Sequence, residues 1–128
     1  MELHPFVISA PAGTLEGVVH IPDTKPRALA IIAHPLPTMG GTMENKVVTT
    51  LAKTFAELCF VALRFNFRGV EGSSGSFDNG EGEVEDVLAV VQHAQMEYGH
   101  LPLVLAGFSF GGYVQACAAQ NCTRATWY

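Results

Sequence analysis

A serine between two glycines carries the clearest chemical signal in this sequence. Ser109 stands in the segment Gly107-Phe108-Ser109-Phe110-Gly111. A serine hydroxyl acts as a nucleophile only where a base takes its proton and hydrogen-bond donors stabilise the oxyanion that forms. A sharp strand-to-helix turn serves this chemistry, because it exposes the serine and aims a helix N-terminus at the reacting atoms. We therefore predict that Ser109 is a catalytic nucleophile, with Gly107 and Gly111 allowing close backbone approach.

Two backbone N–H groups are expected to form an oxyanion hole beside this serine. The first belongs to Phe110, the residue after the nucleophile. The second should come from the loop that follows the apolar run ending at His34. Leu36 lies between two prolines, which have no N–H, so Leu36 is the expected donor and Thr38 the alternative. We interpret His34 as a structural residue of this loop rather than as the catalytic base.

The elements needed to position these groups can be read from hydrophobic periodicity. Continuous apolar runs typical of buried strands alternate with segments of helical spacing, which predicts βαβ units and a parallel sheet. An opening antiparallel hairpin precedes them. The expected strands are residues 6–10, 15–21, 28–33, 60–67 and 101–106, and the expected helices are residues 45–59, a segment from Val84 to Met96, and one from about Gly111. The sequence thus predicts an α/β fold.

Composition excludes several classes of function. The chain has 128 residues, which suits one domain, and 48% of them are hydrophobic. Its net charge of −5 and its lack of a basic stripe argue against nucleic acid as a partner. Five acidic residues between Asp78 and Asp86 are interpreted as a helix start rather than a cation site, since they lack an EF-hand spacing. The expected mechanism needs no metal and no cofactor.

The remaining sequence signals concern location. The three cysteines form no CxxC pair, which favours a reduced, cytoplasmic compartment. The first residues do not follow the pattern of a signal peptide. No apolar run approaches the ~20 residues of a membrane-spanning helix, so we expect no membrane association.

Three ordered motifs resemble a known family. The segments HPLPTMGGTMENKVV, RFNFRGVEGSSGSFDNGEGEVED and AGFSFGGYV are similar to the oxyanion loop, the strand-loop-helix segment and the nucleophile elbow of the α/β-hydrolase superfamily, specifically its small lidless dienelactone-hydrolase-like members. The similarity covers about residues 6 to 118. It implies a doubly wound, mostly parallel sheet with an N-terminal antiparallel hairpin, in which Leu36 and Phe110 face one pocket. It also implies a serine esterase acting on small ester or acyl compounds. Glu71 stands where these proteins usually have glycine, so we expect a slight distortion there.

The acid and the base of a catalytic triad are not found after the serine. In this fold they follow the nucleophile along the chain, but residues 110–128 contain no Asp, Glu or His. The resemblance implies that family members carry both on later elements, so we expect residues 1–128 to be one domain that is incomplete at its C-terminus. We assign no triad role to the histidines and acids before Ser109. This chain alone should be weak or inactive.

Two further expectations follow. The ending NCTRATWY does not resemble the next strand of the fold, which would leave the outer edge of strand 101–106 unpaired and prone to self-association.

The missing acid and base also leave open a non-catalytic binding module on this fold. An acyltransferase or a thioesterase would share the same serine turn and stays open as well.

Overall fold

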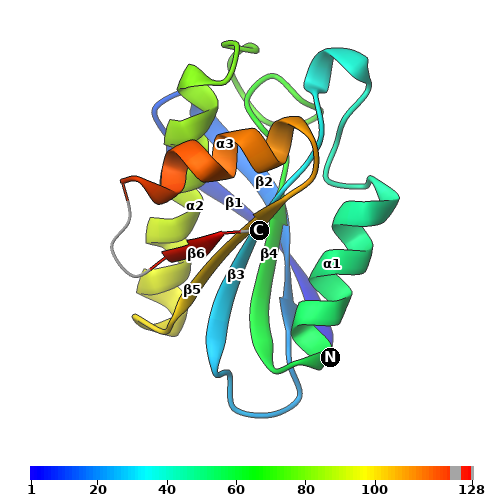
Figure 1. Ribbon diagram of the computed structural model, residues 1–128, viewed down its shortest axis with the longest axis vertical. Helices are drawn as coiled ribbons and strands as arrows, with labels where there is room; N and C mark the ends of the chain where they lie inside the picture. The colour runs from blue at the N-terminus through cyan, green and yellow to red at the C-terminus, as the bar shows by residue number, and fades with distance from the viewer. Residues whose placement is uncertain (122–124, 128) are drawn as a thin grey trace.

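A mixed sheet forms the centre of the computed structural model, which describes residues 1–121 and 125–127. Within this part of the chain the sheet has six strands in the order β1-β2-β4-β3-β5-β6 (Figure 1). β1 and β2 form an antiparallel hairpin, β2 is antiparallel to β4, and the remaining neighbours are parallel. The strands are β1 (Glu2–Ala10), β2 (Gly13–Ile21), β3 (Ala28–Ala33), β4 (Phe60–Phe65), β5 (Leu103–Gly107) and β6 (Ala125–Trp127).

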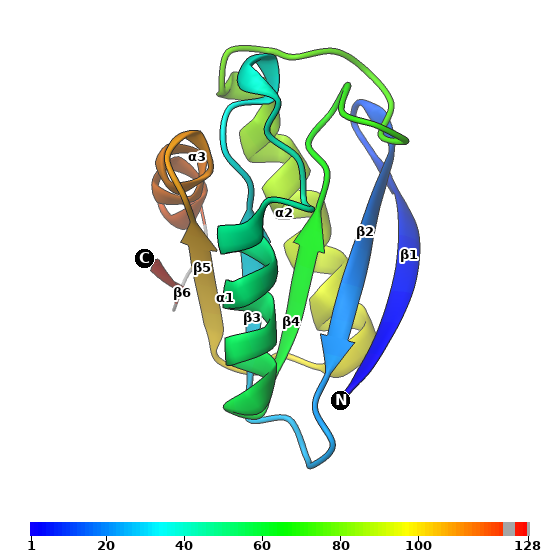
Figure 2. The same ribbon diagram turned by 90° about the vertical axis from the view of Figure 1, so that its right-hand side faces the viewer.

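Helices cover both faces of this sheet. They are α1 (Lys46–Glu57), α2 (Glu81–Tyr98) and α3 (Phe110–Ala119), and a short 3-10 helix, η1 (Pro37–Met39), follows β3. Figure 2 shows α1 in front of β3 and β4 and α2 behind the sheet. Val48 and Ala52 of α1 pack on one face, while Val87 of α2 and Val114 of α3 pack on the other. All six residues of β3 are buried because both faces are covered there.

The predicted α/β class, the opening hairpin and the three buried strands are confirmed. The helix predicted over 45–59 begins after Asn45, whose side-chain oxygen caps it by accepting hydrogen bonds from the N–H groups of Val47 and Val48. α2 ends at Tyr98, and the glycine that follows it, Gly99, has a φ of 93°. No helix in the described ranges combines the length and the apolar character needed to cross a membrane.

One sequence prediction about the C-terminal end is wrong. Ala125–Trp127 do form a strand, and β6 pairs in parallel with the stretch of β5 from Leu103 to Leu105. Three residues are too few for any periodicity to be read, and their pairing depends on α3, which returns the chain to the start of β5. The outer edge of β5 is therefore paired from Leu103 to Leu105, so this edge leaves less unpaired backbone for self-association than expected. Self-association itself stays a prediction.

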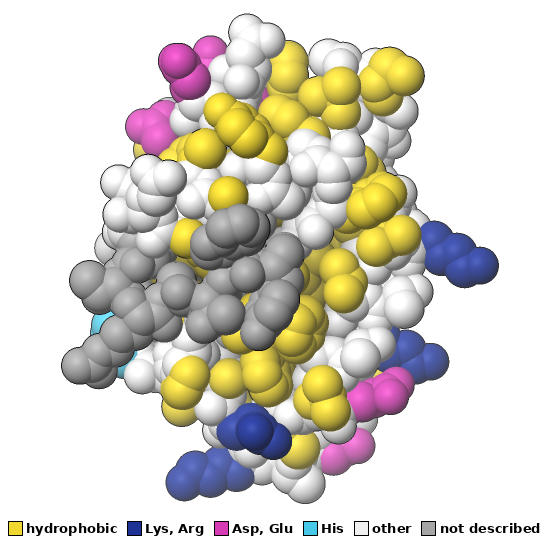
Figure 3. Space-filling view, in the orientation of Figure 1, with side chains coloured by type: hydrophobic (Ala, Val, Ile, Leu, Met, Phe, Trp, Pro, Cys, Tyr) yellow, Lys and Arg dark blue, Asp and Glu magenta, His cyan; other side chains and the backbone are white. Residues whose placement is uncertain are grey.

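The side of β5 that faces α1 is less well covered. Figure 3 shows hydrophobic side chains gathered on the surface around this region. A cavity of about 390 Å³ opens there, between the apolar side of α1 and the carboxyl half of β5. Its lining residues are Leu51, Phe55, Phe60, Val104, Ala106 and Gly107.

Three loops meet at the carboxyl ends of β3, β4 and β5. Because these strands are parallel neighbours, the loops that follow them lie at one edge of the sheet. Ala33 and Gly107 are opposite each other and form the last residue pair between β3 and β5. The loop beginning at His34 and the turn containing Ser109 therefore start side by side.

Candidate active site

Ser109 occupies a strained turn between β5 and α3. Its backbone has φ 58° and ψ −121°, a region that side-chain-bearing residues rarely adopt and that costs about 1–3 kcal/mol. The residue is exposed. Serine at a helix start usually caps the helix with its hydroxyl, but the Ser109 side chain makes no capping hydrogen bond. The turn thus presents a solvent-accessible hydroxyl that is not used to hold the helix.

The two flanking glycines are required by packing. A Cβ on Gly107 would lie 2.5 Å from the carbonyl carbon of Gly111. A Cβ on Gly111 would overlap the carbonyl group of Ala33 and lie 2.6 Å from the carbonyl oxygen of His34. These contacts are with backbone atoms, which cannot swing aside as a side chain can. The start of α3 is therefore pressed against the end of β3, and this contact fixes the strained conformation of the serine.

The two predicted oxyanion donors are backbone N–H groups without an acceptor among the described residues. Phe110 is the first residue of α3, so its N–H has no acceptor within the helix. Leu36 precedes η1, and its N–H makes no hydrogen bond within the described ranges. The Leu36 carbonyl accepts from the N–H groups of Met39 and Gly41, which stiffens the loop. The N–H of Thr38 also lacks an acceptor there, so Thr38 stays open as the alternative donor.

His34 holds two of these loops together. Its imidazole is fully buried. Nε2 lies 3.0 Å from the backbone nitrogen of Phe67 and must accept from that N–H, so the proton resides on Nδ1, which donates to the carbonyl of Pro35 at 2.7 Å. Burial lowers the pKa of His34 to about 4. Both ring nitrogens are used, so His34 positions the loops after β3 and β4 and is not available as a base, in agreement with its predicted structural role.

We expect His34 to stay neutral down to about pH 5. The folded protein resists protonation of this ring, so the stability that neutral His34 contributes is present above its ordinary pKa of 6.5 and is lost as the pH falls toward 4. Imidazole ¹⁵N shifts followed from pH 8 to 4 measure this directly. A free histidine derivative in the same buffer serves as the reference. A His34 midpoint at or above pH 6 would contradict the buried, doubly bonded arrangement.

No histidine or acid within the described ranges is hydrogen-bonded to Ser109. His20 pairs with Arg64. His93 stacks on Phe6 with ring centroids 5.2 Å apart. His4 is exposed on β1, and His100 lies between α2 and β5. The structure therefore brings Ser109 together with Phe110 and the loop of Leu36, but places no base beside the serine.

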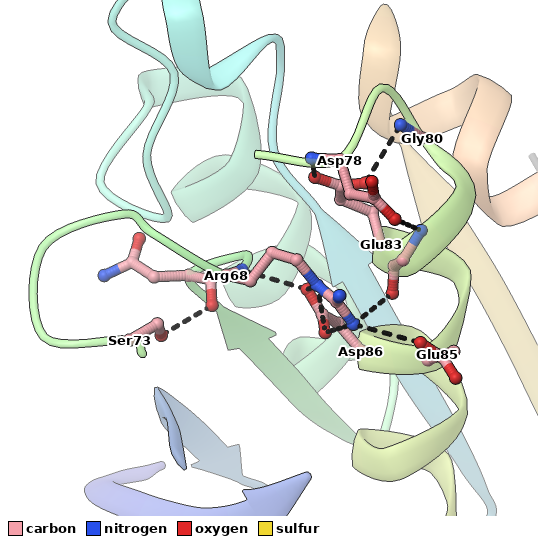
Figure 4. A network of polar contacts seen from close by, with 9 residues as sticks. Arg68, Ser73, Asp78, Gly80, Glu83, Glu85 and Asp86 are labelled. Carbon is pink, nitrogen blue, oxygen red and sulfur yellow. Dashed lines mark hydrogen bonds and ion pairs between the residues drawn. The ribbon is translucent and has the colours of Figure 1, made fainter. Parts of the chain in front are cut away.

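The acidic segment organises the start of α2 (Figure 4). Asp78 accepts from the N–H of Gly82, and the buried Glu83 accepts from the N–H groups of Asp78 and Gly80, each at 2.9 Å. Carboxylates at a helix N-terminus bind its free N–H groups and favour its dipole. The helix-start interpretation of this segment agrees with these contacts.

A buried ion pair in the same region was not predicted from the sequence. Arg68 Nη2 lies 2.8 Å from Asp86 Oδ1, and the Arg68 N–H donates to Asp86 Oδ2 at 2.9 Å. Asp86 is fully buried; burial raises its pKa, and the hydrogen bonds from Arg68 oppose that effect. No local pattern joins residues 18 positions apart, so only the folded loop shows the pair. It anchors the loop after β4 to α2.

A cavity of about 360 Å³ lies between the loops after β3 and β4. Phe77 on its wall packs against Phe110, with ring centroids 5.6 Å apart, and so connects it to the serine turn. Glu71, an exposed residue on the same wall, has a φ of 46°. That left-handed conformation is one that glycine adopts readily, so a glutamate there is strained at the position where we expected a slight distortion. The lining residues are Pro37, Thr38, Gly40, Gly41, Thr42, Arg68, Gly69, Val70, Glu71 and Phe77.

Two solved structures match both the fold and the sequence. An alpha-beta serine hydrolase homologue from Coxiella burnetii is 46% identical, with a TM-score of 0.91 over 97% of this chain. A serine hydrolase without lid from Xanthomonas campestris is 42% identical, with a TM-score of 0.89 over 94% of this chain. The chain belongs to the α/β-hydrolase superfamily.

This α/β-hydrolase chain is shorter than the proteins it matches. It spans 60% of the Coxiella burnetii chain and 56% of the Xanthomonas campestris chain. An uncharacterized protein from Rickettsia prowazekii is 40% identical over 108 residues, which are 83% of this chain and 45% of that protein. No family model matches the sequence. The similarity therefore establishes the superfamily and the fold of this chain.

Proposed function

We propose that the chain carries the nucleophile half of an esterase-type serine hydrolase that acts on small ester or acyl compounds through Ser109. The observation that carries this proposal is the conformation of Ser109. The serine is strained, exposed and not used as a helix cap, at the carboxyl end of a central strand. Strain of this kind persists where the surrounding structure enforces it and is common at active sites.

The chemistry needs the groups that surround this turn. The Ser109 hydroxyl would attack the substrate carbonyl carbon and lose its proton to a base. The carbonyl oxygen would become an oxyanion and accept hydrogen bonds from the N–H groups of Phe110 and Leu36. Both N–H groups lack an acceptor within the described residues. The cavity between the loops after β3 and β4 holds about 360 Å³, a size that suits small substrates, and Phe77 on its wall packs against Phe110 of the turn.

The proposal includes a base and an acid that the described residues do not place at Ser109. The family resemblance implies that both follow the nucleophile on later elements of the fold. An oxyanion hole without a functional triad retains only a residual rate of ~10³-fold over water. The 128-residue chain by itself should therefore be a weak hydrolase.

A non-catalytic binding module is the second candidate function. It is favoured by the absence, within the described ranges, of any histidine or carboxylate hydrogen-bonded to Ser109. The same fold could then bind an ester or acyl compound without turning it over. An acyltransferase or thioesterase would use the same turn, but with an acceptor or substrate other than those of an esterase.

A hybrid protein distinguishes these functions. It replaces residues 120–128 of this chain by all of the Coxiella burnetii protein that follows the position matched to Ala119. We expect the hybrid to hydrolyse 4-nitrophenyl butyrate at least ~10³-fold faster than the 128-residue chain, because the added part supplies the base. A folded hybrid without turnover would favour the binding module. Product appearing only with an added alcohol or thiol acceptor would favour acyl transfer.

A further inference from the structure

A glutamine side chain joins α3 to the two strands that lead into the candidate active site. Gln115 lies in α3 and is fully buried. Its Nε2 donates hydrogen bonds to the carbonyl oxygens of Ile31 in β3 and Ala106 in β5, at 2.9 Å each. Since both acceptors are carbonyl oxygens, the amide nitrogen must face them, which fixes the orientation of the side chain. One amide group therefore holds three elements together.

The two carbonyl groups are close along the chain to the residues that are expected to react. Ala106 is three residues before Ser109, and Ile31 is five residues before Leu36. The helix that carries Gln115 also begins with the residue expected to be the first oxyanion donor. The amide thus connects the strand of the nucleophile, the helix of one donor and the strand that leads to the other donor.

The contacts of α3 with β3 show how this amide fixes the position of the helix. Gly111 packs closely against the carbonyl group of Ala33. Gln115 lies four residues later in α3, and its acceptor Ile31 lies two residues earlier in β3. Four helical residues advance about 6 Å and two strand residues about 6.6 Å, so both contacts fit one path of α3 running opposite to β3. Gly111 allows the close approach, and Gln115 fixes the helix along the strand.

The same side chain carries a buried oxygen without a partner. Gln115 Oε1 is buried and accepts no hydrogen bond from the described residues. An unpaired buried amide oxygen is unfavourable, so burial alone does not favour glutamine over an apolar side chain of similar length. Val114 and Ala118, the fully buried residues on either side of it in α3, are apolar. The two directed hydrogen bonds are what glutamine adds at this position.

We propose that Gln115 is a positioning residue, which holds Ser109 and the backbone N–H of Leu36 at the separation that oxyanion formation needs. Apolar contacts have no preferred direction, whereas two hydrogen bonds to strand carbonyls define a distance and an angle. A displacement of about 1 Å between reacting groups can cost about 10²-fold in rate. This inference rests on the proposed function of Ser109, but the effect of Gln115 on the turn can be measured without any turnover.

Gln115→Met tests this role in the ¹⁵N-labelled 128-residue chain. Methionine has a side chain of similar length but neither donor. We expect a folded variant with a Tm within about 5 °C of the parent, in which the amide signals of residues 107–111 and of Leu36 are broadened by exchange between conformations on the microsecond to millisecond timescale.

Val114→Ala is the matched control in the same helix. It removes part of a fully buried apolar side chain and no hydrogen bond, so it should lower the Tm more than Gln115→Met and leave the same amide signals sharp. Equal broadening in both variants would overturn the proposal. Sharp signals in Gln115→Met, or failure of that variant to fold, would overturn it as well.

The hybrid protein measures the effect on the chemistry. Gln115→Met should lower its kcat for 4-nitrophenyl butyrate about 10- to 100-fold and change KM less than about twofold, because Gln115 does not line the substrate cavity. Val114→Ala should keep kcat within about threefold. An unchanged kcat, or a loss confined to KM, would contradict the role of Gln115. A folded but inactive parental hybrid would instead refute the proposed function, while the amide signals still decide whether Gln115 fixes the turn.

Discussion

Ser109→Ala should lower kcat/KM of the hybrid protein for 4-nitrophenyl butyrate by about 10⁴- to 10⁶-fold. The proposed mechanism forms a covalent bond to this hydroxyl, and removal of a nucleophile from a complete triad costs that order of rate. The fold should be unaffected, because the Ser109 side chain makes no capping hydrogen bond. Initial rates measured over a range of substrate concentrations, together with the Tm of each protein, give the comparison.

Ser76→Ala is the control for this experiment. Ser76 is an exposed serine in the glycine- and serine-rich loop after β4, and it is not hydrogen-bonded in the described structure. Its removal should change kcat/KM by less than about twofold. A Ser109→Ala hybrid that keeps more than about a tenth of the parental rate would show that hydrolysis proceeds through some other group.

Gly111→Ala should destabilise the chain by about 3 kcal/mol. The added methyl group would overlap the carbonyl of Ala33 and approach the carbonyl oxygen of His34 at 2.6 Å. Since these atoms belong to the backbone of a buried strand and the loop after it, α3 would have to move away from the sheet. Urea unfolding followed by circular dichroism measures the change in the free energy of unfolding.

Gly112→Ala provides a matched control at the next position. A Cβ there would lie 3.6 Å from the nearest atom, the carbonyl oxygen of Gly107, which is an ordinary contact. Alanine is favoured over glycine within a helix, so this variant should be more stable by about 0.5–1 kcal/mol. Equal effects of the two substitutions would contradict the close approach of α3 to β3.

Local patterns were sufficient to predict the elements that carry the site. The run from Ala28 to Ala33 is uninterrupted by polar residues because both of its faces are covered, and it forms the predicted strand. Asn45 and Gly99 mark the ends of helices by their own capping chemistry. The turn at Ser109 could be found because a strand-to-helix turn of this kind has a recognisable pattern, with a glycine two residues before the serine and another two residues after it.

Features that depend on distant residues could not be predicted in the same way. The two hydrogen bonds of the His34 ring join loops after different strands. The ion pair of Arg68 and Asp86 forms only after the intervening loop has folded back. The pairing of β6 with β5 needs α3 to return the chain along the sheet. In each case the partner residue lies far away along the chain and comes into contact only in the folded structure.

The most direct test of the central claim is covalent labelling of the hybrid protein with a fluorophosphonate, followed by peptide mapping. We predict one adduct per chain, on the peptide containing Ser109, and none after heat denaturation, because the reaction needs the folded turn and its oxyanion donors. An adduct on another serine of this chain, or a folded and hydrolytically active hybrid that carries no adduct, would contradict the claim that Ser109 is the nucleophile.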